Sequence, residues 1–97
     1  MIQPSIGRVI WFTPSVNDDP RADIKQPLVG LVTYVWHDRL INLTTFDQNG
    51  NSLGGRTSVQ LLQDDDPKPE HGYFASWMPY QKGQAAKTEA LEAATAR

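Results

Sequence analysis

The sequence predicts a mainly β protein, in which five short strands form a small barrel that is followed by one C-terminal α-helix. The densest apolar segment, residues 27–46, divides into two β-branched runs around a short polar turn at residues 37–39, which is the pattern of a β-hairpin. Three further apolar runs are short and are bounded by Pro, Gly, Asn and Asp, which favour turns. From residue 84 the composition changes to Ala, Glu, Lys and Gln, which are strong helix formers.

The composition indicates one small soluble domain. The chain has 97 residues, a formal net charge of −2 and no cysteine. The lack of cysteine excludes disulfides, thiolate catalysis and cysteine-ligated zinc, and a slightly acidic chain does not fit a general binder of phosphate backbones, which carries a basic face. The first residues lack the features of a signal peptide, and the apolar runs are shorter than the roughly 20 residues of a membrane span. We therefore expect a protein that is neither secreted through a signal peptide nor inserted in a membrane.

The first expected strand covers residues 8–13 and ends at Pro14, which cannot donate to a β-ladder. Since side chains alternate along a strand, one face carries Val9, Trp11 and Thr13 and the other carries Arg8, Ile10 and Phe12. Both faces are partly apolar, so either Trp11 or Phe12 is expected to meet a loop, the tail or a partner. Residues 14–26 then form a long polar connection that is rich in turn residues.

The central hairpin is expected to pair residues 28–36 with residues 40–46. The first run contains too many β-branched residues to be a comfortable helix, and alternation sets Leu31, Thr33 and Val35 against Val32, Tyr34 and Trp36. In the second run, one face carries Ile41, Leu43 and Thr45 and the other carries Leu40, Asn42, Thr44 and Phe46. We expect Leu43 and its face to lie in the core.

Two more strands are expected in the second half of the chain. Residues 47–51 contain an Asn-Gly pair, which tolerates the positive φ angles of a hairpin turn, and residues 52–56 are expected to extend this turn into a mobile loop. The fourth strand is expected at residues 57–62 and the fifth at residues 71–78, with a rigid acidic loop at residues 64–70 between them.

The C-terminal helix is expected to run from Gln84 to Arg97, with Gly83 at its cap. Its one large apolar residue is Leu91, which lies within a stripe of alanines. An isolated helix of this length is marginal in water. We therefore expect it to fray unless Leu91 and the alanine face dock on the barrel or on a partner.

This order of elements, with a long first loop and tighter later turns, predicts an SH3-like small barrel. The alternative is a five-stranded OB-type barrel, which has longer strands and usually a helix between the third and fourth strands. Residues 46–57 show no helical pattern, which favours the SH3-like fold. The predicted organisation is a barrel over residues 1–82 and a helical tail over residues 83–97.

Residue chemistry predicts no catalytic, cofactor-binding or metal-binding site. The run from Asp64 to Asp66 lacks the alternating ligands, central glycine and distal glutamate of a calcium loop, so a solvated or partner-facing acidic patch is the preferred interpretation. The two histidines, His37 and His71, lie at an expected turn and strand edge, without a recognisable nucleophile or orienting carboxylate. We expect a protein that is not an enzyme.

Aromatic side chains are the strongest candidates for binding. They are numerous for so small a barrel and cannot all be buried, and exposed aromatic clusters often bind proteins, peptides or bases. The candidate protein-binding residues are Trp11, Phe12, Tyr34, Trp36, Trp77, Tyr80 and, on the helix, Leu91. The alternative is that they form the core and a docking surface for the helix. Polyproline recognition is disfavoured because residues 14–26 contain no aromatic residue, and the acidic balance disfavours nucleic acid.

Several short motifs resemble those of a group of small proteins encoded by tailed bacteriophages and prophages. The motifs are Gly7-Arg8-Val9, Gln26-Pro27-Leu28, Val32-Thr33-Tyr34-Val35-Trp36, Ile41-Asn42-Leu43, Phe46-Asp47, Thr57-Ser58-Val59 and Trp77-Met78-Pro79-Tyr80. The resemblance covers roughly residues 7–82. It implies a small β-barrel and a phage setting. These relatives are mostly uncharacterised, so no functional residue is carried over from them.

The resulting expectation is a non-enzymatic structural or assembly protein of a phage. It would dock on a capsid or head–tail lattice as a decoration or cement subunit, with other phage proteins or further copies of itself as partners, and it would be found in the virion. The alternative is an accessory protein in the host cytoplasm that binds a host defence factor, a regulatory factor or a nucleotide signal. A nucleotide pocket would need Arg8, Arg39 or Arg56 beside Tyr34 or Trp36.

Overall fold

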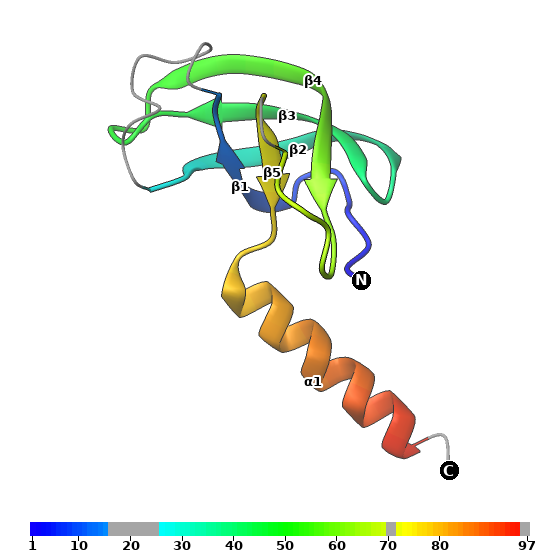
Figure 1. Cartoon of the computed structure of the whole chain (residues 1–97). Coiled ribbons are helices and arrows are strands. Elements are labelled where there is room, and N and C mark those ends of the chain that lie inside the picture. Colours follow the sequence, from blue (N-terminus) through cyan, green and yellow to red (C-terminus); the bar gives the residue numbers. More distant parts are fainter. Residues whose placement is uncertain (16–25, 70–71, 96–97) are drawn as a thin grey trace.

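In the described part of the chain, five strands close into a barrel, and one helix follows them (Figure 1). The computed structural model describes residues 1–15, 26–69 and 72–95. Its elements are β1 (Val9–Thr13), β2 (Leu28–His37), β3 (Leu40–Phe46), β4 (Ser52–Leu62), β5 (Phe74–Ser76) and α1 (Pro79–Thr95). The predicted fold class is confirmed: the protein is mainly β, with a small five-stranded SH3-like barrel and a C-terminal helix. In the described residues, no helix is long and apolar enough to cross a membrane.

The barrel is a meander of four antiparallel strands that β5 closes. Strands β1 to β4 pair in chain order, and β5 inserts between the two ends of the meander, antiparallel to β1 and parallel to β4. One cross-strand row shows the closure, because Ala75 of β5 is the register partner of both Phe12 of β1 and Leu61 of β4. All three side chains are fully buried, so the closing row also forms part of the core.

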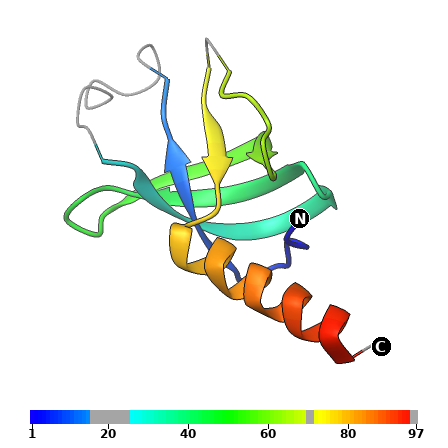
Figure 2. The same ribbon diagram turned by 60° about the horizontal axis from the view of Figure 1, so that its bottom comes forward.

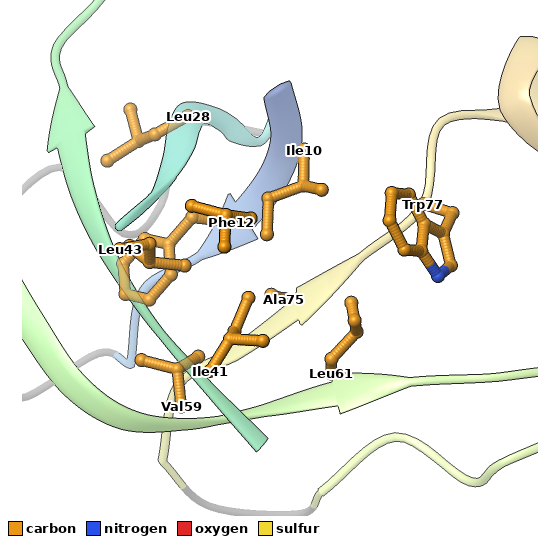
Figure 3. Close-up of a cluster of buried hydrophobic side chains, with 10 residues drawn as sticks. Ile10, Phe12, Leu28, Ile41, Leu43, Val59, Leu61, Ala75 and Trp77 are labelled. Atoms are coloured by element: carbon orange, nitrogen blue, oxygen red, sulfur yellow. The ribbon is translucent and has the colours of Figure 1, made fainter. Parts of the chain in front are cut away.

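The core consists of the inward-facing side chains of all five strands (Figure 3). Its members are Ile10, Phe12, Leu28, Val32, Ile41, Leu43, Val59, Leu61, Ala75 and Trp77. The expected core face of β3 is confirmed, since Ile41, Leu43 and Thr45 are at most 1% exposed. On β1 the structure selects Ile10 and Phe12 for the core and leaves Trp11 on the outer wall.

The expected alternation along β2 is wrong beyond its midpoint. Val32 is buried, but Tyr34 and Trp36, which the sequence pattern placed on the same face, are exposed. The register with β3 shifts between Val32 and Tyr34 and again between Val35 and His37. Such β-bulges insert an extra residue and re-aim the side chains that follow, so the outer half of β2 presents its aromatic residues to solvent.

Two expected boundaries in the second half of the barrel are wrong. Strand β4 begins at Ser52, so residues 52–56 pair with β3 and do not extend the preceding loop. The remaining turn is tight because Oδ1 of Asp47 accepts hydrogen bonds from the backbone N–H of Asn49 at 2.9 Å and of Asn51 at 2.8 Å. Strand β5 covers only Phe74–Ser76. The predicted start of this strand at His71, most of the loop at residues 14–26 and the last two helix positions lie outside the described residues.

The helix begins at Pro79, earlier than the expected Gln84, and Gly83 lies inside it. Proline is favoured at the first helical position because its fixed φ is already helical. Oε1 of Gln81 accepts a hydrogen bond from the backbone N–H of Met78 at 2.8 Å, which is half of a capping box. The amide nitrogen of Gln81 also donates to the carbonyl oxygen of Val9 at 2.8 Å, which ties the first turn of the helix to β1.

Beyond its first turn, the helix leads away from the barrel (Figures 1 and 2). None of its described side chains is buried, and the molecule is elongated, with principal extents of 52 × 24 × 24 Å. Leu91 is 69% exposed, so it does not pack on the barrel.

Candidate interaction site

The seven side chains expected to form a binding surface lie in four different places. Phe12 and Trp77 are at most 2% exposed and belong to the core, so they offer no surface to a partner. Trp11 is half-buried on the outer wall of the barrel. The exposed members are Tyr34 and Trp36 on β2 and Tyr80 and Leu91 on α1.

Tyr34 and Trp36 form an exposed aromatic pair on the outer end of β2. Their ring centroids are 4.8 Å apart and the ring planes meet at 69°, an edge-to-face arrangement that aromatic pairs favour electrostatically. Tyr34 is 47% exposed and Trp36 is 56% exposed. The indole N–H of Trp36 donates to Oδ1 of Asn42 on β3 at 3.0 Å, which fixes the ring over the neighbouring strand.

Asn42 connects the aromatic pair to a strained position in β4. Its Oδ1 also accepts a hydrogen bond from the backbone N–H of Ser58 at 2.8 Å. Ser58 has a φ of 54°, which is unfavourable for a residue other than glycine, and it lies where the register between β3 and β4 shifts. We name Tyr34, Trp36 and Asn42 the aromatic platform. The Trp36 ring is held by its hydrogen bond to Asn42, and the Tyr34 ring packs against it.

A cleft of about 530 Å³ lies against the outer wall of β1 and β5. Its floor includes Trp11 and Thr13 of β1, Phe74 and Ser76 of β5 and Leu62 of β4. Each of these residues neighbours a core residue in its strand, so it faces outward. Prolines and charged groups complete the lining, namely Pro14, Pro27, Pro79, Asp64, Asp66, Lys68 and Lys82, together with Gln26 and the edge of Trp77. We name it the wall cleft.

Both carboxylates of the wall cleft are already paired with cations. Oδ1 of Asp64 lies 2.9 Å from the α-amino group of Met1, and this hydrogen bond is the main cause of the raised pKa of that amine. Oδ2 of Asp66 accepts hydrogen bonds from Nε of Arg39 at 2.8 Å and from the backbone N–H of Gln63 at 2.9 Å. These two bonds, that of Arg39 first, lower the pKa of Asp66.

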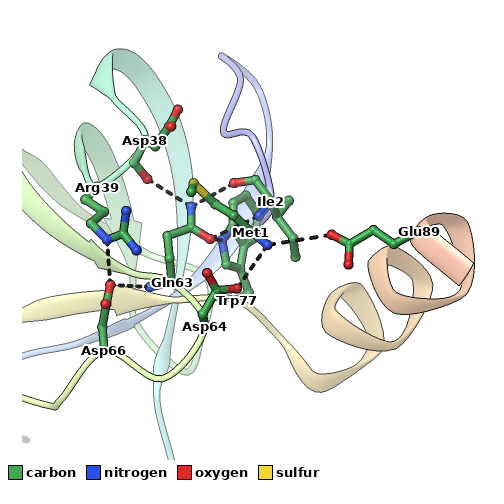
Figure 4. Close-up of polar contacts among 9 residues, drawn as sticks. All are labelled: Met1, Ile2, Asp38, Arg39, Gln63, Asp64, Asp66, Trp77 and Glu89. Carbon is green, nitrogen blue, oxygen red and sulfur yellow. Dashed lines mark hydrogen bonds and ion pairs between the residues drawn. The ribbon is translucent and has the colours of Figure 1, made fainter. Parts of the chain in front are cut away.

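A buried glutamine closes the end of the barrel next to this cleft (Figure 4). Gln63 is 1% exposed, and its amide oxygen accepts from the backbone N–H of Ile2 and the indole N–H of Trp77, both at 3.1 Å. Its amide nitrogen donates to the carbonyl oxygens of Ile2 at 2.7 Å and Asp38 at 2.9 Å. The amide thus joins the N-terminal segment, the β2–β3 turn and the residue after β5. Sequence reasoning missed Gln63, because a polar residue after an apolar run has no distinguishing pattern.

The three arginines considered for a nucleotide pocket contact groups other than the aromatic platform. The guanidinium of Arg8 lies 5.2 Å from the ring centroid of Trp77, and that of Arg39 binds Asp66. The guanidinium of Arg56 lies 5.9 Å from the ring centroids of both Phe12 and Tyr73. These contacts do not place an arginine beside Tyr34 or Trp36.

The two histidines and the acidic side chains were the remaining candidates for catalysis or metal binding. Nδ1 of His37 accepts a hydrogen bond from the backbone N–H of Arg39 at 3.2 Å, within the hairpin turn, and His71 lies outside the described residues. Among residues 1–15, 26–69 and 72–95, no three His, Asp or Glu side chains are grouped so that they could hold a metal ion.

Comparison of the chain with protein-family models, curated proteins and solved structures finds no significant match. The sequence and the geometry above are therefore the basis of the functional proposal.

Proposed function

We propose that this chain is a non-enzymatic structural or assembly protein of a tailed-phage particle, which docks on a capsid or head–tail lattice through the aromatic platform. The phage setting rests on the sequence motifs described above. The docking role rests on one structural observation, the exposed edge-to-face pair of Tyr34 and Trp36.

The platform has the properties of a protein-binding hot spot. Tyrosine and tryptophan bury a large apolar area while keeping a polar group for a partner, and they dominate the energy of many interfaces. The hydrogen bond from Trp36 to Asn42 restricts the indole before binding, which reduces the entropy lost on association. Oδ1 of Asn42 is occupied by two donors, so its NH₂ group remains as a donor at the surface.

The exposed face of the helix is the second surface that would contact the lattice. Tyr80 and Leu91 are 74% and 69% exposed, and they share one face because eleven residues span about three helical turns. The opposite face, with Ala85, Ala86 and Glu89, lies toward Met1 and Ile2. The exposed face is therefore free to contact a lattice neighbour while the first turn stays anchored to β1.

Mass spectrometry of purified virions of the encoding phage, with copy numbers, tests the proposal. We expect many copies of this chain in a simple ratio to the major capsid protein. Absence from virions, with the protein present in infected cells, would overturn the structural role and favour an accessory protein in the host cytoplasm.

A variant then assigns the contact to the platform. Phages that encode Trp36→Ala should incorporate fewer copies, because the substitution removes the main anchor. Thr33→Ala, a change at an exposed position of the same strand, is the matched control and should leave the copy number unchanged. Equal incorporation of both variants would show that the platform is not the docking site.

A further inference from the structure

The floor of the wall cleft is an outward-facing surface with two aromatic side chains, and no described residue covers it fully. Trp11 and Leu62 are both register partners of Ser76, and Thr13 pairs with Phe74, so these residues form two adjacent cross-strand rows. Pro79 and Lys82 of the first helical turn line the cleft, and the helix then leads away from the barrel (Figures 1 and 2). With the described residues in place, the two aromatic and the two hydroxyl side chains of the floor are each partly exposed.

The charges around this floor favour an anion. Asp64 and Asp66 each have a cation within 2.9 Å, so neither carboxylate needs a cationic ligand. Lys68 and Lys82 also line the cleft, and among the described residues neither ammonium group forms an ion pair. The cleft thus combines apolar surface with two lysines that form no ion pair with a described carboxylate.

We propose that the wall cleft binds a small organic anion that carries an aromatic group. The aromatic group would lie against Trp11 and Phe74, and the anionic group would be held by Lys68 and Lys82. The volume of about 530 Å³ lies within the range of roughly 300–1,000 Å³ that small-molecule sites occupy. This site is separate from the aromatic platform, so it is independent of the proposed docking function.

A fluorescence titration of the full chain with 8-anilinonaphthalene-1-sulfonate (ANS) tests the proposal, since this probe combines an aromatic system with one sulfonate. We expect saturable binding of one ANS per chain. The uncharged analogue N-phenyl-1-naphthylamine should bind at least threefold more weakly. Absence of saturable ANS binding, or equal affinity for the two probes, would overturn the proposal.

Lysine variants test the charge requirement. The double variant Lys68→Gln/Lys82→Gln should weaken ANS binding about threefold to tenfold, as expected for two solvent-exposed ion pairs. Lys87→Gln, a change on the helix outside the cleft, is the matched control and should leave the affinity unchanged. Wild-type affinity of the double variant would show that its lysines do not hold the anion.

The location of the probe is read from the wild-type chain by NMR, so it does not depend on how any variant folds. The chain has three tryptophans, whose indole N–H signals are assigned by triple-resonance experiments on the isotope-labelled wild-type chain. ANS should shift the Trp11 signal and the backbone amides of Phe74 and Ser76. A shift confined to the Trp36 indole would place the probe on the aromatic platform and overturn the assignment to the wall cleft.

Discussion

The indole N–H of Trp77 donates to the amide oxygen of Gln63 at 3.1 Å, and both side chains are at most 2% exposed. Because Gln63 also binds the backbone of Ile2 and Asp38, this one buried amide holds together segments that are 61 and 25 residues apart from it along the chain. An amide with two acceptor and two donor bonds is fully satisfied, so its burial carries little penalty.

Replacing this amide should destabilise the barrel strongly. Gln63→Ala leaves the indole N–H of Trp77 and the backbone groups of Ile2 without their partner, and each unsatisfied buried group costs about 1–3 kcal/mol. We expect a loss of about 2–4 kcal/mol in the free energy of unfolding, measured by urea denaturation. Gln60→Ala, at an exposed position of β4, the strand that precedes Gln63, is the control and should change stability by less than about 0.5 kcal/mol. A similar loss in both variants would contradict the structural role of the amide.

The core position of Leu43 gives a second expectation. Its side chain is 1% exposed, so Leu43→Ala should cost about 2–5 kcal/mol through lost burial and a residual cavity. Thermal and chemical unfolding both measure this loss. A cost below about 1 kcal/mol would mean that the core tolerates or refills the cavity, in conflict with a closely packed barrel.

The alternation of side chains along β3 was enough to predict that the face of Leu43 lies in the core. The same pattern along β1 did not predict whether Trp11 or Phe12 would be the buried residue. Both residues are large and apolar, and they differ only in which side of β1 faces the barrel axis. Phe12 is the buried residue, and it pairs with the equally buried Ala75, which follows it by 63 residues. Local sequence carries no signal for this choice, because the closing strand is distant in the chain and only three residues long.

The error in the start of the helix has a local cause that is visible in the sequence. The helix begins at Pro79 and not at the expected Gln84, because Pro79 at its first position and Gln81 at its third form a helix start with half a capping box. The β-bulges in β2 cause another error, because they place Val32 in the core and Tyr34 and Trp36 outside, whereas alternation sets all three on one face. A bulge depends on pairing with a neighbouring strand, so a single strand's sequence does not reveal it.

The strained bulge beneath the platform gives a third expectation. Ser58→Gly removes the steric cost of a positive φ at that position, which is about 1–2 kcal/mol, but adds freedom to the unfolded chain. We expect a change between neutral and about 1 kcal/mol of stabilisation. Gln60→Gly, at an ordinary strand position, should instead destabilise by about 0.5–1 kcal/mol. Calorimetry of the two variants distinguishes them, and equal destabilisation would argue against strain at Ser58.

The ion pair between Arg39 and Asp66 gives an expectation for pH. The hydrogen bond from Arg39 lowers the pKa of Asp66 from its ordinary value of 3.8. A carboxyl whose pKa is lower in the folded state stabilises the fold above its unfolded pKa. Its contribution should therefore be complete above about pH 5 and be lost as the pH falls through the lowered pKa.

Urea unfolding of the wild type and of Asp66→Asn, from pH 6 down to pH 2, measures this contribution. The difference in stability between the two proteins should shrink as the medium becomes more acidic. Arg39→Gln removes the other partner and should flatten the acid dependence only in part, because the backbone N–H of Gln63 still donates to Asp66 and also lowers its pKa. If the difference between wild type and Asp66→Asn stayed constant over this range, the ion pair would not be the source.

The helix gives the last expectation, because it packs little of its surface against the barrel. None of its described side chains is buried, and its polar contacts with the rest of the described residues include the bond from Gln81 to Val9 and the contact of 3.7 Å between Glu89 and the Met1 amine. Deleting residues 84–97 keeps Gln81 and removes the weak contact of Glu89 together with side chains that are not buried. We expect the shortened chain to unfold cooperatively in urea, with a stability within about 1 kcal/mol of the full chain. Gln81→Ala in the full chain tests the retained anchor and should cost about 0.5–1.5 kcal/mol through its lost hydrogen bonds. Loss of cooperative unfolding on deletion would show that the distal helix is part of the folding unit and that its exposed face contributes to the barrel's stability.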